Sequence, residues 1–149
     1  MFFDEEMLLD LRLNIMNEYV DKFVITESVY MHSGKPKKLI FDINKFSKFK
    51  DKIIYIVVDK APPDLIEIKK DESIVIKQSK MTINAKKREI YQINKTQDEL
   101  VNANQNDMII ISDLDEIPNL EKVDFRIINQ KLIFFKQKMF YYKLNLYYK

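Results

Sequence analysis

The stretch IIYIVVDKAPPD, residues 53–64, sets the architecture: six apolar residues follow one another and then meet Pro62 and Pro63. An unbroken run of β-branched and aromatic residues is typical of a strand covered on both faces, as in a parallel sheet. The prolines end the run because they lack the N–H that a strand ladder needs. The sequence therefore predicts a covered strand at residues 53–58.

Three other segments contain strand-forming residues. KFVITES (22–28) is rich in β-branched and aromatic residues and predicts a strand, and DMIIIS (107–112) predicts a third. The C-terminal segment QKLIFFKQKMFYYKLNLYYK (130–149) predicts one or two strands that are too aromatic to lie uncovered. Between residues 65 and 81 the pattern is weak, and short strands or a loop both remain open.

Two helices are expected among these strands. The first follows Asp4 as N-cap, and its apolar positions at helical spacing are Met7, Leu8, Leu11, Ile15 and Tyr19. The second spans residues 85–103, and its apolar stripe includes Ile90, Ile93, Gln97, Leu100 and Val101.

Helices that alternate with strands predict an α/β fold with a layered, mostly parallel sheet. In such sheets ligands bind beyond the carboxyl ends of the strands. The predicted ends are ES, DKAPPD and SDLDE, so polar groups are expected together at one edge.

The composition narrows the class of protein. A chain of 149 residues is expected to form a single domain, residues 1–149. Its net charge of +2 gives no broad basic field, which argues against a nucleic-acid partner. No apolar run is long enough to predict a transmembrane segment. The single glycine excludes the Gly-rich dinucleotide loop and the P-loop, and the absence of cysteine permits a reducing compartment.

Asp113 and Asp115 follow the third apolar run and are the strongest chemical signal. Two residues apart in a roughly extended segment, both carboxylates can point the same way while Leu114 faces the core. Such a pair suits a hard cation such as Mg²⁺ or Mn²⁺. An Asx turn or a helix cap explains the same residues equally well. A phosphatase of the haloacid dehalogenase type, with Asp113 as nucleophile, is a weaker alternative because its acidic motif belongs near the start of the chain.

Four segments, taken in order, resemble the glycosyltransferases of family 17, whose animal members are bisecting β-1,4-N-acetylglucosaminyltransferases. They are LLDLRLNIMNEYVDKFVITESVYMHSGKPKKLIF, DKAPPD, KKREIYQIN and DMIIISDLDEIPN, and they cover most of residues 3–120. The resemblance implies a GT-A type, nucleotide-sugar-binding fold. It also implies transfer of N-acetylglucosamine from a UDP-sugar donor to a glycan acceptor, with inversion.

The resemblance assigns roles to individual residues. Asp113 and Asp115 match the acidic motif that would hold Mn²⁺ or Mg²⁺ against the diphosphate, and Asp113 would share the metal or bind the ribose. Glu27, in the ES position, would accept hydrogen bonds from uracil or ribose, with a loop cap as the alternative. Arg88 would contact the diphosphate, with an ion pair to an acid such as Glu89 as the alternative.

Other residues have less defined roles. Glu116 is expected to orient its neighbours, and His32, the only histidine, to contact substrate. The basic loop residues Lys35, Lys37 and Lys38 would neutralise phosphate or simply be solvated. No catalytic base is identified, so the catalytic residues stay unknown.

The chain departs from the family in length, and much of the C-terminal acceptor half is expected to be missing. A non-catalytic nucleotide-sugar-binding or interaction module is therefore the second interpretation of function. An RNA-binding protein that uses the aromatic and lysine residues of the C-terminal segment is weaker, given the balanced charge. Without a leader or anchor pattern, a cytoplasmic protein of a bacterium or an infected cell is expected. The aromatic segment would offer a surface for a homo-oligomer.

Overall fold

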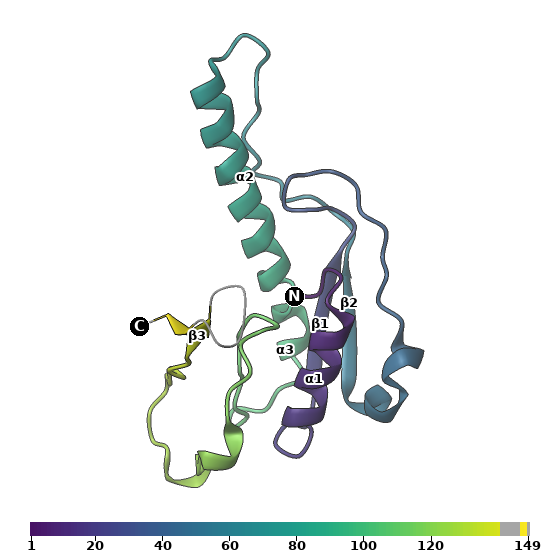
Figure 1. Ribbon diagram of the computed structural model, residues 1–149, viewed down its shortest axis with the longest axis vertical. Coiled ribbons are helices and arrows are strands. Elements are labelled where there is room, and N and C mark those ends of the chain that lie inside the picture. The colour runs from purple at the N-terminus through teal and green to yellow at the C-terminus, as the bar shows by residue number, and fades with distance from the viewer. Residues whose placement is uncertain (141–146, 149) are drawn as a thin grey trace.

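The computed structural model describes residues 1–140 and 147–148, with the side chains of residues 1–139. At its centre β1 (Phe23–Ser28) and β2 (Ile53–Val58) pair in parallel, with Phe23 opposite Ile53 and Ser28 opposite Val58. Helix α1 (Glu6–Met16) lies beside this pair, and the long helix α2 (Ile74–Asn94) extends well beyond it (Figure 1). The predicted α/β class and the parallel pairing of the first two strands are therefore confirmed.

Helix α1 buries a different face from the one expected. Leu9, Leu13 and Met16 are buried, whereas Met7 and Leu11 are 86% and 50% exposed. The helix has apolar residues on nearly every side, so spacing alone could not select the face that packs. Its N-cap is Glu5 rather than Asp4, and no side chain caps it.

The core forms where α1 meets β1 and the 3₁₀ helix η1 (Ile43–Lys52). Phe41 connects η1 to β2, because its ring stacks on Phe46 at 5.6 Å and on Tyr55 at 4.6 Å between centroids. The buried apolar cluster consists of Phe2, Leu9, Leu13, Met16, Phe23, Ile25, Phe46, Phe49 and Leu120. Removing apolar surface from water contributes about 25 cal/mol of free energy per Å². The fold is therefore stabilised mainly by the packing of this cluster.

Helix α2 begins eleven residues before the predicted start at Ala85 and ends at Asn94 rather than at residue 103. The Ser73 hydroxyl caps it by accepting a hydrogen bond from Ile76 N. This start was not predicted because residues 74–76 are all β-branched, which is more typical of a strand. A separate short helix, α3 (Gln97–Leu100), follows it. The predicted stripe is only partly covered, since Ile90 is 46% exposed and Val101 is 82% exposed.

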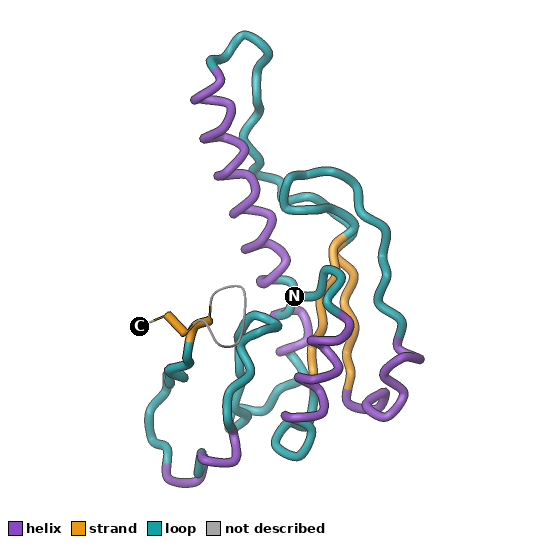
Figure 2. Tube along the Cα trace, in the orientation of Figure 1, coloured by secondary structure: helices purple, strands orange, loops and turns teal. Residues whose placement is uncertain are grey.

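The sheet is smaller than predicted. Residues 107–112 form no strand, although Ile110 packs against the core while Ile109 and Ile111 are exposed. Strand β2 is not covered on both faces, because only Val58 of its residues is buried. In the described part of the chain the parallel sheet therefore has two strands, and Figure 2 shows the acidic region running through loop.

The C-terminal part is mostly irregular. It contains the 3₁₀ turns η2 (Leu120–Lys122) and η3 (Phe125–Ile127) and the antiparallel pair β3 (Met139–Phe140) and β4 (Tyr147–Tyr148). Two short strands are thus present, but Phe134 is 84% exposed, so the expected covering of this segment is wrong at that residue. Residues 141–146 and 149 of the predicted strands lie outside the described residues. None of the helices described in the chain has the length and apolarity to cross a bilayer.

Candidate functional site

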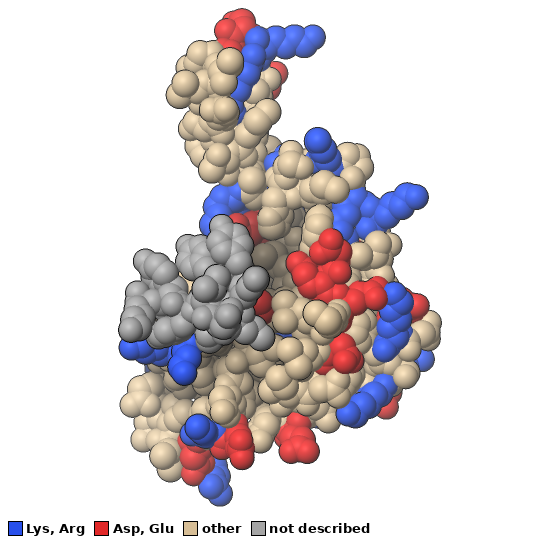
Figure 3. Space-filling view, in the orientation of Figure 1, with Lys and Arg blue, Asp and Glu red and all other residues tan. Residues whose placement is uncertain are grey.

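A cavity of about 600 Å³ lies beyond the carboxyl end of β1. Its wall comes from the N-terminal segment, from the loop after β1, from α2 and from the acidic motif far along the chain. Its polar lining includes Glu5, Ser28, His32, Lys37, Asp113 and Asp115. On the face seen in Figure 3, acidic side chains gather around the central recess. Two of the three predicted strand-end segments, ES and SDLDE, therefore meet here, whereas DKAPPD does not contribute to the lining.

The acidic motif forms a turn that is closed by Glu116. The main-chain N–H of Glu116 donates to Asp113 O at 3.1 Å, and Glu116 Oε2 accepts from Asp113 N at 3.1 Å. Leu114 packs against the core, while Asp113 and Asp115 are exposed and line the cavity. Among the described residues, nothing donates a hydrogen bond to either of these two carboxylates. The turn therefore leaves both of them free for a ligand.

Arg12 of α1 holds this turn from the protein side. Its Nη1 donates to Asp113 O and Glu116 O, each at 2.8 Å, and more weakly to Leu114 O at 3.4 Å. Its Nη2 donates to Ser112 Oγ at 2.6 Å. Burial lowers the pKa of Arg12, and the nearby carboxylates, of Glu116 first, act in the opposite direction. The guanidinium thus fixes the main chain of the motif.

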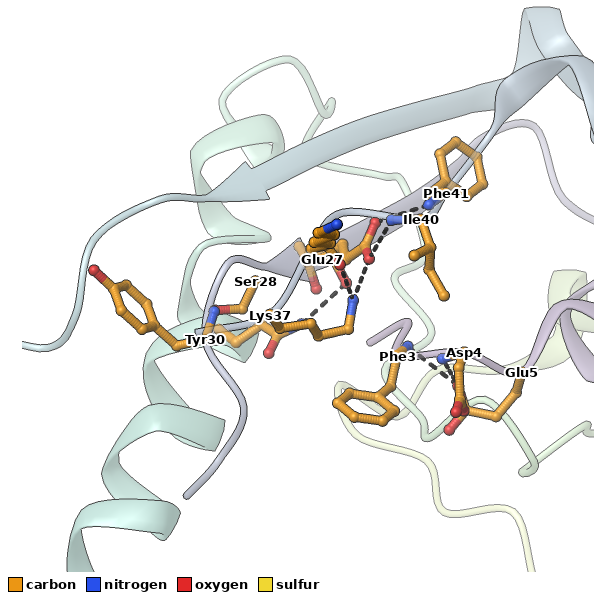
Figure 4. Close-up of polar contacts among 12 residues, drawn as sticks. Phe3, Asp4, Glu5, Glu27, Ser28, Tyr30, Lys37, Ile40 and Phe41 are labelled. Carbon is orange, nitrogen blue, oxygen red and sulfur yellow. Dashed lines mark hydrogen bonds and ion pairs between the residues drawn. The ribbon is translucent and has the colours of Figure 1, made fainter. Parts of the chain in front are cut away.

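Glu27 is fully buried at the base of the loop after β1 (Figure 4). Its Oε1 accepts from Lys37 Nζ and from Ile40 N at 3.0 Å, and its Oε2 accepts from Tyr55 OH at 2.7 Å and Phe41 N at 3.1 Å. Burial alone would raise the pKa of Glu27, but these donors, led by Lys37, bring it below its usual value. Burial, together with the hydrogen bond to Glu27, raises the pKa of Tyr55.

These contacts favour the loop-cap interpretation of Glu27. With four protein donors on its two oxygens, the carboxylate has little capacity left for uracil or ribose. Lys37 is also not a solvated loop lysine, because its side chain is 8% exposed and paired with Glu27. Lys35 and Lys38, by contrast, are exposed. The ion pair fixes the residue 29–41 loop, which forms one wall of the cavity.

Arg88 lies behind that loop. Its Nη1 donates to His32 O at 3.1 Å, and its guanidinium packs against Gly34, the single glycine, which has a φ of +88°. It does not pair with Glu89, whose carboxylate binds Lys86 at 2.7 Å. Arg88 is not part of the cavity lining, so it reaches the site through the His32 main chain.

Three features of the site were not predicted from the sequence: the contact of Arg12 with the turn, the pairing of Lys37 with Glu27, and the role of Gln92. The Gln92 side chain is buried and donates to Thr26 O at 3.0 Å, tying α2 to β1 beside the cavity. Contacts across such distances in the chain leave no local pattern. The one available signal was an arginine placed among the apolar residues of the first helix.

Comparison with known proteins decides the family. The model of glycosyltransferase family 17 matches residues 1–147, which is nearly the whole chain. The chain belongs to glycosyltransferase family 17. Two further comparisons, one with curated proteins and one with solved structures, give no match. The family 17 assignment implies a sugar donor and a glycan acceptor, and it disfavours the haloacid dehalogenase interpretation of the acidic motif.

The acidic turn fits a hard cation in one particular way. The described residues contain no group of three or more metal-binding side chains. Within the turn, Asp113 and Asp115 would provide the carboxylate oxygens on the cavity side, and Glu5 lines the same cavity from the N-terminal segment. Mg²⁺ is commonly held by one or two carboxylates together with substrate phosphates and water. The residues present therefore suit an ion that enters together with a phosphate-bearing ligand.

Proposed function

We propose that this family 17 protein is a metal-dependent glycosyltransferase with a GT-A-like site, which transfers N-acetylglucosamine from UDP-N-acetylglucosamine to a glycan acceptor with inversion. The observation that carries the proposal is the pair Asp113 and Asp115, which lines the cavity beyond β1 in a chain of this family. Asp115 is the principal candidate ligand for Mn²⁺ or Mg²⁺, and Asp113 shares the ion or binds the ribose.

The charge of the cavity supports a need for the cation. Of the acidic lining residues, Glu5, Asp113 and Asp115 form no ion pair with a lysine or arginine side chain among the described residues, and Lys37 is already paired with Glu27. The Met1 amino group and the Arg12 guanidinium both interact with Asp113 through their charge, but the three carboxylates outnumber these two cations. A diphosphate would therefore meet net negative charge. Like charges at a few ångströms repel strongly where water is partly excluded. The site is expected to bind the donor well only after the carboxylates have taken up a cation.

A bound divalent cation would stabilise the negative charge that develops on the UDP oxygens as the sugar–phosphate bond breaks. The protein's own contribution is to orient the two carboxylates and to shape the cavity. Ser28, Tyr30 and His32 are further polar residues of the lining on the loop side. We expect them to contact the sugar or the acceptor.

The second candidate is a non-catalytic nucleotide-sugar-binding module. It is favoured by the absence, in the described residues, of a third metal-binding side chain beside the acidic pair. Both candidates predict binding of the donor together with the cation. They differ in whether the sugar–phosphate bond is broken.

Turnover separates the two candidates. The purified protein is incubated with Mn²⁺ and with UDP-N-acetylglucosamine, UDP-glucose or UDP-galactose, and free UDP is measured with and without glycan acceptors. UDP release that is greatest with UDP-N-acetylglucosamine is the expected result for the enzyme. Mn²⁺-dependent donor binding without UDP release would instead support the module.

Two variants test the acidic pair in the same assay. Asp115→Asn should lower Mn²⁺-dependent UDP binding at least about tenfold, because an amide oxygen is a poorer ligand for a hard cation. Asp51→Asn is the matched control, since Asp51 is also exposed but precedes β2 at the opposite end of the sheet. Equal binding by the two variants would contradict the assignment of the metal to Asp115.

A further inference from the structure

The guanidinium of Arg12 donates hydrogen bonds to four oxygen atoms of the acidic turn, one from each of four residues. These are Ser112 Oγ and the main-chain oxygens of Asp113, Leu114 and Glu116. From this we infer that Arg12 is the positioning residue of the site: it orients the Asp113 and Asp115 carboxylates toward the cation and the donor diphosphate. The inference rests on the proposed function and adds to it a residue in the first helix.

Arg12 binds main-chain oxygens of the turn and leaves the side-chain carboxylates of Asp113 and Asp115 on the cavity side. Main-chain carbonyl oxygens are also good ligands for hard cations. Arg12 binds the carbonyls of Asp113 and Glu116 at 2.8 Å, so these oxygens face α1. The side chains of Asp113 and Asp115 are left exposed on the cavity side. The planar fork of the guanidinium suits this task, because it can donate to several oxygens at fixed angles.

Arg12 belongs to a helix, α1, that is well anchored in the core. Leu9, Leu13 and Met16 of the same helix are buried in the core, with exposed fractions of 2%, 0% and 2%. On the other side, Leu114 anchors the turn against the same core. The turn is therefore held on one side by the packing of Leu114 and on the other by the Arg12 guanidinium. A site that is ordered before its ligand arrives avoids the entropic cost of ordering during binding.

Arg12 also adds a positive charge close to Asp113, Asp115 and Glu116. By charge alone, it would weaken the binding of Mn²⁺. Its removal therefore has opposite expected effects under two explanations. If Arg12 acts only through its charge, Arg12→Met binds Mn²⁺ more tightly than the wild type. If Arg12 positions the turn, the same variant binds Mn²⁺ and UDP more weakly.

The test is calorimetric titration of Mn²⁺, and of UDP in saturating Mn²⁺, into the wild type, Arg12→Met and Arg12→Lys. Circular dichroism and thermal denaturation confirm that each variant is folded at the titration temperature. Both variants are expected to bind Mn²⁺ and UDP at least about tenfold more weakly, because lysine keeps the charge but not the fork. Ser112→Ala, which removes only the Nη2 contact, is expected to weaken binding by a smaller factor, and it tests the inference even if the Arg12 variants do not fold.

Lys52→Met is the matched control. Lys52 Nζ also donates to main-chain oxygens, those of Asn17 and Val20 at 2.6 and 2.8 Å, and so fixes the end of α1 away from the cavity. This variant should lose stability and keep the wild-type affinities. A purely structural role for Arg12 predicts the same behaviour from the Arg12 variants.

The outcomes separate the inference from the function on which it rests. Wild-type affinity in Arg12→Met and Arg12→Lys, or tighter Mn²⁺ binding by Arg12→Met, overturns the positioning role and leaves the proposed function standing. Wild-type affinity in Ser112→Ala, where that variant alone folds, also overturns it. A wild-type protein that binds neither Mn²⁺ nor UDP overturns the proposed function, and the role of Arg12 falls with it.

Discussion

Replacing Glu27 by glutamine should strongly destabilise the fold, because no orientation of the amide satisfies its surroundings. Each carboxylate oxygen accepts two hydrogen bonds: Oε1 from Lys37 and Ile40 N, and Oε2 from Tyr55 and Phe41 N. An amide NH₂ at either position would face a main-chain N–H, which cannot turn away. The Lys37 ammonium, with a side chain only 8% exposed, would also lose its counter-charge.

The size of the effect follows from the burial of the pair. Removing one partner of a buried ion pair costs about 3–5 kcal/mol. Unfolding entropy of about 2.1 cal/mol/K per residue gives about 0.3 kcal/mol/K for 149 residues. The midpoint of thermal denaturation should therefore fall by about 10–16 °C. Differential scanning calorimetry measures this directly.

Glu6→Gln is the matched control for this change. Glu6 pairs with Lys45 at 2.5 Å, but the two side chains are 39% and 52% exposed. An exposed ion pair contributes little, so the midpoint should move by less than about 3 °C. If Glu27→Gln shifts the midpoint no more than Glu6→Gln does, the Glu27 network does not hold the loop after β1 in place.

The remaining predictions concern pH and two local contacts. Because the pKa of Glu27 is lowered below its usual 4.5 in the folded protein, the unfolded state binds more protons in acid. The midpoint difference between the wild type and Glu27→Gln should be complete at neutral pH and should shrink as pH falls below about 4.5 through the folded-state pKa; an equal difference at pH 3 and pH 7 would contradict this. Asn84→Leu should cost about 2 kcal/mol and speed amide exchange at Ile66, whose N–H and C=O both bond to the buried Asn84 side chain at 2.8 Å; unchanged exchange there would refute the contact. Gly34→Ala should destabilise, since φ is +88° and the new Cβ would lie 2.7 Å from Arg88 Nη2; in an Arg88→Ala background part of the loss should disappear, whereas an equal loss in both backgrounds would exclude the clash.

The sequence was sufficient where a pattern is local. Residues 53–58 and 22–28 were predicted as strands, because β-branched runs bounded by turn residues carry their own signal. The buried face of α1 was not predictable, because apolar residues surround that helix and only the partner surface selects Leu9 and Leu13. Residues 107–112 have strand-like composition, but a strand also needs a neighbour with which to share a hydrogen-bond ladder, and in the described chain they have none.

The candidate site shows the same division. Asp113 and Asp115 could be identified as candidates because acidic residues directly after an apolar run are unusual. They line a cavity with Ser28 as expected, although residues 107–112 before them form no strand. The contact of Arg12 with Asp113 joins residues 101 positions apart, and no pattern within the sequence announces it. The family resemblance predicted that Glu27 contacts the donor, whereas its burial favours a structural role.

In the proposed function, the carboxylates of the acidic turn bind a nucleotide sugar through a divalent cation. Its most direct test is calorimetric titration of UDP-N-acetylglucosamine into the wild type with Mn²⁺ and with a chelator. We expect binding with Mn²⁺ and an affinity lower by at least about tenfold in the chelator. Equal affinity under the two conditions would contradict it.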